Sequence, residues 1–192
     1  YGITTWIKES LYFGLINPLN TFLKGLPWWY TSLIFICIAR LISGRGLAIA
    51  TAIGFLFIGA TDLWILGMIT LSTVTVSVLI CFMAGVPLGI LAAYNRTVDA
   101  LLKPVLDTMQ TMPIFVYLVP VIMLFGGGQV SAVIATVIYA IPPLIRCTTL
   151  GIRELPEEIN EVSRSFGAST IQILVKVKIP MAMPTIMVGI NQ

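Results

Sequence analysis

Long apolar runs, separated by short polar breaks, are the feature that most limits how this chain can fold. These runs cover about 27–42, 46–60, 63–93, 104–125 and 130–150, and another begins at 180. Hydrophobic residues make up 58% of the 192 residues and charged residues only 10%, whereas soluble domains carry about 25% charged residues. Because so little polar surface is available to face water, the sequence predicts an all-α, polytopic integral membrane protein in a lipid bilayer.

The apolar runs predict the positions of the membrane-spanning helices. The run 63–93 is too long for one straight span of about 20 residues, so 63–69 is interpreted as an extracytoplasmic segment before the third helix. Residues 1–26 mix aromatic and charged side chains, which is typical of a short amphipathic helix at the membrane interface. Residues 27–192 form the transmembrane domain, with helices expected at about 27–42, 46–60, 70–93, 104–125 and 130–150, and the start of a sixth from 180.

The distribution of basic residues predicts the topology. If the loops 43–45, 94–103 and 151–179 lie on one side, that side collects Arg40, Arg45, Arg96, Lys103, Arg146, Arg153, Arg164, Lys176 and Lys178. The opposite side keeps only two basic residues, both in the N-terminal segment. Basic residues concentrate in cytoplasmic loops, so we expect these three loops to be cytoplasmic and the N-terminus to be extracytoplasmic.

Small residues and prolines in the apolar runs predict how the helices pack and bend. Gly85, Gly89 and Ala92–Ala93 recur at near-helical spacing and predict a face on which another helix packs closely. Proline removes a backbone donor, so it predicts kinks that either bend during transport or are static. The prolines within the runs are Pro104, Pro113, Pro120, Pro142 and Pro143.

The residue types present exclude several kinds of chemistry. There is no histidine, which removes the commonest general base and most zinc sites. Cys37, Cys81 and Cys147 lie in separate apolar runs without a Cys-x-x-Cys pair, which indicates core packing. The basic residues are scattered, so nucleic-acid binding is not expected. No GxxxxGK(S/T) loop occurs, so ATP, if it is used, binds another chain. We expect no catalytic, metal or cofactor site in this chain.

The stretch Glu154–Pro180 is the longest polar segment and holds four of the eight acidic residues. Pro156 and the two glutamates after it suit the first turn of a helix. Phe166 lies on the apolar face of this helix, and Gly167 suits the left-handed position that ends it. The stretch either docks on a partner or is a solvated linker between two spans.

A second short helix is predicted after the glycine. Ser169 and Gln172 have the spacing of a capping box. The helix is expected to run through 171–177 and to end near Pro180. The predicted product is two helices around a sharp corner on the cytoplasmic face of the membrane.

This loop resembles the cytoplasmic "EAA" motif of ATP-binding-cassette importer permeases. The motif has an acidic residue, two small residues, a glycine six positions after the acid, and an apolar-x-apolar-Pro ending. Here it reads Glu161-Val162-Ser163, then Gly167, then Val177-Lys178-Ile179-Pro180. Val162 and Ser163 depart from the two alanines of the motif, while the spacing of the glycine and the proline is kept.

A closer resemblance, to the glycine betaine/proline betaine permease family, is carried by residues 108–120, 141–146, 163–168 and 182–192. It implies a type I importer permease fold, two permease copies in a homodimer, and cytoplasmic ATPase subunits that bind Mg-ATP. It also implies an extracytoplasmic substrate-binding protein or a fused domain. The loop's first helix would insert into a groove on the ATPase. The residues implied in this coupling are Glu158, Glu161, Val162, Ser163, Phe166, Gly167, Ala168 and Pro180.

The translocation path is predicted to be neutral and aromatic. No ionisable residue lies near a predicted midplane, which weakens a proton-coupled mechanism but leaves a sodium-coupled secondary transporter open. Phe115, Tyr117 and Tyr139 are available for cation–π contact with a quaternary ammonium group, or are ordinary packing residues. A permease for another small solute and a membrane anchor without a transport path are the remaining alternatives.

Overall fold

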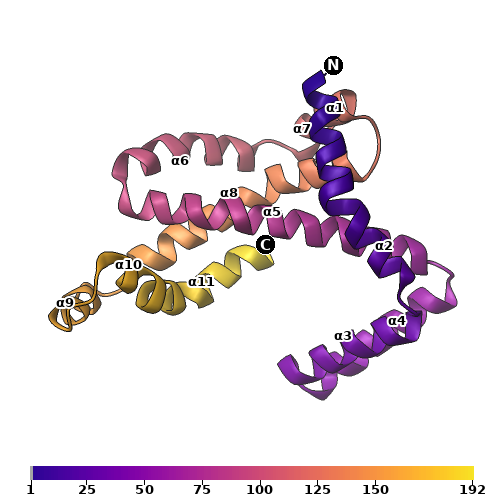
Figure 1. Cartoon of the computed structure of the whole chain (residues 1–192), viewed down its shortest axis with the longest axis horizontal. Coiled ribbons are helices and arrows are strands. Elements are labelled where there is room, and N and C mark those ends of the chain that lie inside the picture. Colours follow the sequence, from indigo (N-terminus) through magenta and orange to yellow (C-terminus); the bar gives the residue numbers. More distant parts are fainter. Residues whose placement is uncertain (1) are drawn as a thin grey trace. The chain divides into compact units, whose positions relative to one another are not determined.

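The computed structural model describes residues 2–192, and these residues form helices joined by short turns, without any strand (Figure 1). The prediction of an all-α protein is therefore confirmed. The helices are α1 (Gly2–Leu11), α2 (Asn17–Gly25), α3 (Trp28–Ser43), α4 (Arg45–Ala60), α5 (Trp64–Tyr94), α6 (Arg96–Thr111), α7 (Ile114–Phe125), α8 (Gln129–Arg153), α9 (Glu158–Ser165), α10 (Thr170–Ile173) and α11 (Ile179–Asn191). Two π-helical turns, η1 (Tyr12–Ile16) and η2 (Leu174–Lys178), continue α1 into α2 and α10 into α11.

The chain forms two compact units. The first unit comprises the chain up to Val76 together with Gly127–Val130, and the second comprises Ser77–Gly126 and Ser131–Gln192. The long helices α5 and α8 each contribute to both units. The polar loop 154–180, predicted to face the cytoplasm, lies wholly in the second unit, as do all residues implied in coupling.

Three helical stretches are long and apolar enough to cross a membrane, namely Trp64–Tyr94, Gln129–Arg153 and Thr170–Asn191. Two bent pairs, α1–α2 with α3 and α6 with α7, raise the number to five if each pair counts as one span. The apolar helix α4 has only 16 residues, or about 24 Å at 1.5 Å per residue. The prediction of a polytopic helical membrane protein is therefore confirmed.

Residues 64–69, interpreted as an extracytoplasmic segment before the third span, are helical and continuous with that span in α5. The helix begins at Trp64 and continues for 31 residues. It starts directly after the turn at Thr61–Asp62, where Asp62 has a φ of 57°. A helix of this length measures about 46 Å, which exceeds a hydrocarbon core of about 30 Å. The helix is therefore longer than the hydrocarbon core is thick, and it is unbroken.

The expected fourth span at 104–125 covers the second half of α6 and the whole of α7. Helices α6 and α7 meet at a bend of 93°. Pro113 has no backbone N–H and forces Met112, which has a ψ of 135°, into an extended conformation. The bend confirms the predicted kink at this proline. It also separates the amphipathic α6 from the apolar α7.

The first unit contains the N-terminal helices and the α3–α4 hairpin. Residues 2–25 form a continuous helical segment that bends by 102° into α3 at Leu26–Pro27. Gly44, with a φ of 84°, makes the sharp turn between α3 and α4. Phe35 and Phe55 pack across this hairpin with their ring centroids 5.5 Å apart.

A buried polar cluster that the sequence did not predict also lies in the first unit. The Gln129 side-chain amide lies 3.3 Å from Ser72 Oγ and 3.2 Å from Thr73 Oγ1, and it donates to both. Its side-chain oxygen accepts a hydrogen bond of 3.1 Å from Asn20 Nδ2. The cluster joins α2, α5 and the first residue of α8. Such hydrogen bonds are well protected in an apolar environment, where unpaired polar groups are costly.

The core of the second unit lies between α5, α8 and α11. Cys81, Leu144, Ile152, Ala182 and Ile186 form it, all nearly inaccessible. The predicted packing face on α5 is confirmed at two glycines of this helix. A Cβ atom on Gly89 would lie 2.5 Å from the Thr148 Cβ, and one on Gly85 would lie 2.9 Å from a Leu144 methyl group. The small residues therefore let α8 approach α5 closely.

This close approach gives a stability prediction. Replacing Gly89 with leucine should lower the thermal unfolding midpoint in detergent by several degrees, because overpacking costs about 1–3 kcal/mol. Gly54 in α4 is the matched control, since a Cβ atom there meets no atom within 4 Å. The change Gly54→Leu should leave the midpoint unchanged. Equal midpoints for both variants would show that the α5–α8 contact is not tightly packed.

Candidate functional site

The loop between α8 and α11 begins with the short helix α9 (Glu158–Ser165). Glu158 and Glu161 lie in its first turn and Arg164 in its last turn. This arrangement is favourable because a helix has a positive N-terminal end and a negative C-terminal end. Val162 and Phe166 are exposed, with 55% and 86% of their surface accessible. Phe166 is the more exposed of these two apolar side chains in the polar loop.

The corner after α9 is a Schellman motif, the two-bond helix ending that contains a left-handed residue. Gly167 has a φ of 77°, which confirms the predicted left-handed conformation. Its N–H donates to the Arg164 carbonyl at 2.8 Å, and the Ala168 N–H donates to the Ser163 carbonyl at 3.1 Å. Both bonds satisfy carbonyls at the helix end that have no partner within the helix. The corner fixes the direction in which Phe166 projects.

The capping box predicted for the second helix is confirmed. The Ser169 N–H donates to Gln172 Oε1 at 2.8 Å, and the Gln172 N–H donates to Ser169 Oγ at 3.4 Å. The expected end of this helix near Pro180 was wrong. The helix continues through the π-helical turn η2 into α11, where Pro180 lies in the first turn. A widened turn accommodates the missing proline donor, so the loop enters α11 without a break.

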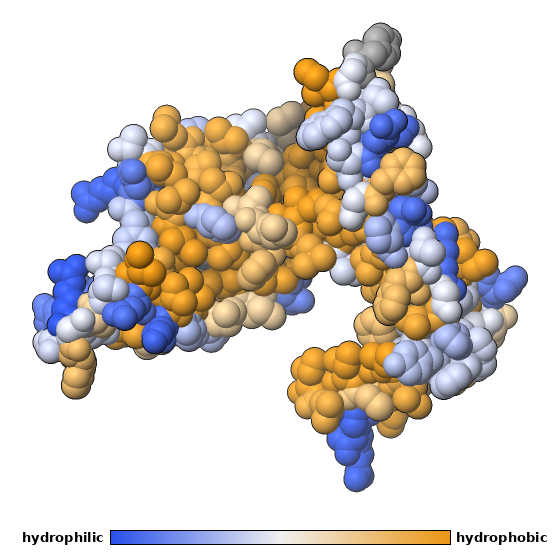
Figure 2. All heavy atoms as spheres, in the orientation of Figure 1, coloured by the Kyte–Doolittle hydropathy of each residue, from blue (hydrophilic) through white to orange (hydrophobic). Residues whose placement is uncertain are grey.

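The residues implied in coupling differ in how far they are exposed to solvent. Ser163 and Ala168 are half-buried, whereas the remaining coupling residues are exposed: Glu158, Glu161, Val162, Phe166, Gly167 and Pro180. In Figure 2, hydrophilic atoms gather at the α9 end of the second unit, while hydrophobic atoms cover much of α5 and α8. The loop is therefore a polar element with a few apolar side chains on its surface.

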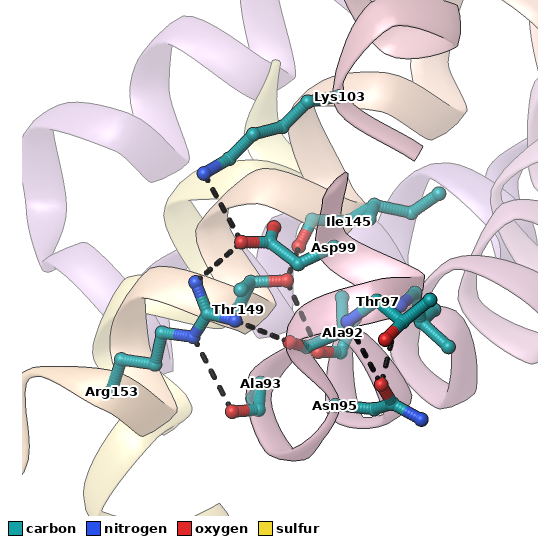
Figure 3. A network of polar contacts seen from close by, with 11 residues as sticks. Ala92, Ala93, Asn95, Thr97, Asp99, Lys103, Ile145, Thr149 and Arg153 are labelled. Carbon is teal, nitrogen blue, oxygen red and sulfur yellow. Dashed lines mark hydrogen bonds and ion pairs between the residues drawn. The ribbon is translucent and has the colours of Figure 1, made fainter. Parts of the chain in front are cut away.

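A polar network holds the start of this loop (Figure 3). Arg153, the last residue of α8, donates from Nη2 to the Ala92 carbonyl at 2.5 Å and from Nε to the Ala93 carbonyl at 3.3 Å. Its Nη1 donates to Asp99 Oδ2 at 2.7 Å. Lys103 Nζ lies 3.1 Å from the same carboxylate oxygen. One guanidinium therefore connects the end of α8, the end of α5 and the start of α6.

Asp99 is held as an anion in this network. The hydrogen bond from Arg153 is the main cause that lowers the pKa of its carboxyl, and Lys103 lowers this pKa further, while burial acts in the opposite direction. Asn95 fixes the neighbouring turn, because its side-chain oxygen accepts from the Thr97 N–H at 2.9 Å. The spacing of Asp99 and Lys103 could have been identified from the sequence as an i,i+4 pair. The contact with Arg153, 54 residues away, could not.

Comparison with known proteins assigns the part of the chain that contains this loop. Residues 85–191 match the family described as "binding-protein-dependent transport system inner membrane component". The chain belongs to this family. The match begins within α5 and ends in α11, so it includes the Arg153 network, α9 and the glycine corner.

Relatives with curated descriptions confirm the resemblance to glycine betaine permeases. The chain is 47% identical over 178 residues to the glycine betaine/proline betaine transport system permease protein ProW of Escherichia coli, covering 93% of this chain and 50% of that protein. It is 44% identical over 186 residues to the glycine betaine transport system permease protein OpuAB of Bacillus subtilis, covering 93% and 66%. It is 38% identical over 192 residues to the trimethylamine N-oxide transport system permease protein TmoV of Ruegeria pomeroyi, covering 100% and 29%. The chain thus spans about half the length of ProW.

The three aromatic residues predicted for a translocation path all lie in the second unit of the chain. Phe115 and Tyr139 are 73% and 47% exposed. Tyr117 is half-buried, and its hydroxyl is buried without a hydrogen-bond partner among residues 2–192. Burying a hydroxyl without a hydrogen-bond partner is energetically costly. Their role in a path stays a prediction.

A second ion pair joins α6 to α8. Arg146 Nη2 pairs with Asp107 Oδ1. On α6 the two acids are eight residues apart, and on α8 their arginine partners are seven residues apart. These separations correspond to about 12 and 11 Å along antiparallel helices. The two pairs therefore align α6 along the last turns of α8.

Proposed function

We propose that this chain is the membrane permease subunit of an ATP-driven importer for glycine betaine or a related quaternary ammonium osmolyte. The observation that carries the proposal is the exposed Phe166 beside the left-handed Gly167, in a loop within the family match. The glycine betaine permeases among the relatives support this substrate class. The chain would provide the path across an inner membrane, and a partner would supply the energy.

The proposal includes three partners. A cytoplasmic ATPase subunit would bind Mg-ATP and receive α9 in a groove on its surface. A second copy of the permease would complete the path as a homodimer, and an extracytoplasmic binding protein or a fused domain would deliver the substrate. The loop 154–178 would be cytoplasmic and the N-terminus extracytoplasmic, as the distribution of basic residues indicates.

The coupling residues would have distinct roles in this contact. Phe166 is the most exposed apolar side chain of the loop and would be the anchor that fills a pocket on the ATPase. Gly167 would keep α9 at the required angle. Glu158 and Glu161 would meet basic residues at the rim of the groove. Val162, Ser163 and Ala168 would provide close contact, and Pro180 would begin the helix that returns into the membrane.

The aromatic residues give the proposed substrate a chemically suitable path. The cationic head of a betaine carries methyl groups, and such cations are recognised by aromatic faces. Phe115, Tyr117 and Tyr139 would provide these faces while the absence of a midplane charge avoids trapping a zwitterion. ATP-driven closure of the partner subunits would switch the path between its two openings.

Substitution at Tyr139 tests the substrate path. Tyr139→Leu should raise the substrate concentration for half-maximal uptake about 5- to 30-fold, because a cation–π contact contributes about 1–2 kcal/mol when desolvated. Tyr139→Phe keeps the aromatic face, so its substrate concentration for half-maximal uptake should stay close to that of the unchanged protein. Uptake of radiolabelled glycine betaine by the reconstituted complex measures both. Equal half-maximal concentrations for Tyr139→Leu and Tyr139→Phe would exclude Tyr139 from the path.

Reconstitution tests the function itself. The chain should co-purify with its ATPase subunit, and glycine betaine delivered by its binding protein should stimulate ATP hydrolysis in liposomes. Uptake that needs an ion gradient and no ATPase would instead indicate a secondary transporter. If trimethylamine N-oxide stimulates ATP hydrolysis and glycine betaine does not, trimethylamine N-oxide would be the favoured substrate. The similarity to TmoV supports this alternative.

A further inference from the structure

Two cations lie at the two ends of the loop 154–178, and both contact the end of α5. Arg153 directly precedes the loop, and its guanidinium donates to the Ala92 and Ala93 carbonyls. Carbonyls in the last turn of a helix lack partners within the helix and are favourable sites for a cation. Arg153 therefore caps the C-terminal end of α5.

Lys178 makes the second contact with the same helix end. Its Nζ lies over the ring of Tyr94, 5.0 Å from the ring centroid. Tyr94 is the last residue of α5, and Lys178 is the last residue of η2. A cation at this distance over an aromatic face is attracted by the ring electrons. The two stems of the loop are thus attached to three consecutive residues, Ala92–Tyr94.

Between the stems, a hollow separates α9 from the end of α5. It has a volume of about 350 Å³, and its lining includes Asn160, Glu161 and Arg164 of α9 together with Tyr94 and Lys178. A displacement of α9 therefore cannot pass to α5 by direct packing across this space. Movement of α9 would therefore reach α5 through the two ends of the loop, at Arg153 and Lys178, which we call its stems.

The end of α5 is well placed to move neighbouring helices. Ala92 is almost completely buried, at 1% accessible, and Asn95 caps the start of α6 in the following turn. Asp99 on the first turn of α6 also binds Arg153. A force on Arg153 therefore acts on α5 and α6 together, through groups whose positions are fixed by hydrogen bonds (Figure 3).

We infer that Arg153 and Lys178 are positioning residues that clamp both stems of the coupling loop to Ala92–Tyr94, and that this double clamp transmits movement of α9 to α5 and α6. The inference rests on the proposed function, because it describes how the same loop passes on the movement of an ATPase. Neither residue contacts substrate or nucleotide in this role. Each acts through the helix end that it holds.

Substitutions at the Lys178 clamp separate transmission from folding. Lys178→Gln and Tyr94→Leu should each lower the substrate transported per ATP hydrolysed about fivefold or more, the range expected for a coupling interaction, while basal hydrolysis and binding of the ATPase persist. Lys178→Arg and Tyr94→Phe keep the cation and the ring and should stay near the unchanged ratio. The double variant should be no worse than either single change, since both remove one contact.

Lys176 provides a matched control for Lys178, and Arg153 allows a separate test of the other stem. Lys176 lies on the same turn η2, is exposed and forms no ion pair among residues 2–192, so Lys176→Gln should leave the transport ratio unchanged. Arg153→Lys keeps the charge but cannot reach three acceptors with one planar group, so it should lower the ratio as well. An unchanged ratio in Arg153→Lys and Lys178→Gln would overturn the inference, as would a parallel loss of uptake, hydrolysis and ATPase binding.

Hydrogen exchange provides a readout that does not depend on transport. In nanodiscs, the backbone amides at 94–99 and 157–166 should exchange faster in Lys178→Gln and Arg153→Lys than in the unchanged protein, because released stems allow local opening. Lys176→Gln should not change them. Unchanged exchange in the clamp variants would overturn the inference. Faster exchange in a protein that shows no ATP-driven uptake would support the clamp and reject the proposed function.

Discussion

Replacing Phe166 with aspartate should uncouple ATP hydrolysis from uptake in the reconstituted importer while the helices remain inserted. The side chain is 86% exposed, so its loss does not disturb a core, and stability should change little. Buried aromatic anchors at protein interfaces contribute about 2–4 kcal/mol or more, and a charge in the same pocket adds a desolvation cost. We therefore expect uptake to fall at least about 30-fold, the factor that 2 kcal/mol represents.

The measurement is betaine uptake and ATP hydrolysis in liposomes, together with co-purification of the ATPase. Ile171 on α10 is a matched control, because it is 74% exposed and lies beyond the Gly167 corner. Ile171→Asp should transport normally, and Phe166→Tyr should retain most activity because the ring is kept. Normal uptake by Phe166→Asp would show that this side chain does not contact the ATPase.

Replacing Gly167 with proline should have the second large effect. Proline fixes φ near −65°, whereas Gly167 has a φ of 77°, so the corner cannot form as it stands. Proline also lacks the N–H that donates to the Arg164 carbonyl at 2.8 Å. The direction of Phe166 relative to the return helix would change, and a displaced anchor cannot fill its pocket.

We expect Gly167→Pro to reduce uptake by an order of magnitude or more, with ATPase binding weakened and the membrane helices intact. Gly167→Asn is the matched control, since asparagine tolerates the left-handed conformation far better than other residues with a Cβ atom. It should keep most of the uptake. Equal activity of the proline and asparagine variants would show that the left-handed corner is not required for coupling.

The parts of the site that could be predicted depend on interactions between neighbours in sequence. Gly167 ends α9 because glycine alone adopts a φ of 77° without strain. Ser169 and Gln172 form a capping box because they are three residues apart. The apolar runs likewise predicted α3, α4 and α8 within a few residues, because each must satisfy its backbone within the membrane.

The errors arose where two local signals competed. Proline was expected to end a helix at Pro180, but the π-helical turn η2 before it allows the helix to continue. At Pro113 no such turn occurs, and the chain bends by 93°. The same residue type therefore gives opposite outcomes at these two positions. The sequence contains no simple signal for a π-helical turn.

By itself, the sequence determined that the chain is a helical membrane protein with one polar, glycine-cornered loop, because hydropathy and helix endings depend on residues a few positions apart. Only the tertiary structure decided what holds that loop. Arg153 meets the carbonyl of Ala92 across 61 residues, and Lys178 meets the ring of Tyr94. The sequence pattern predicts neither contact. Which helix end a cation caps depends on how α5, α8 and α11 pack. The small residues predict a packing face on α5, but the helix that fills it is decided by contacts between distant residues, such as Gly89 against Thr148.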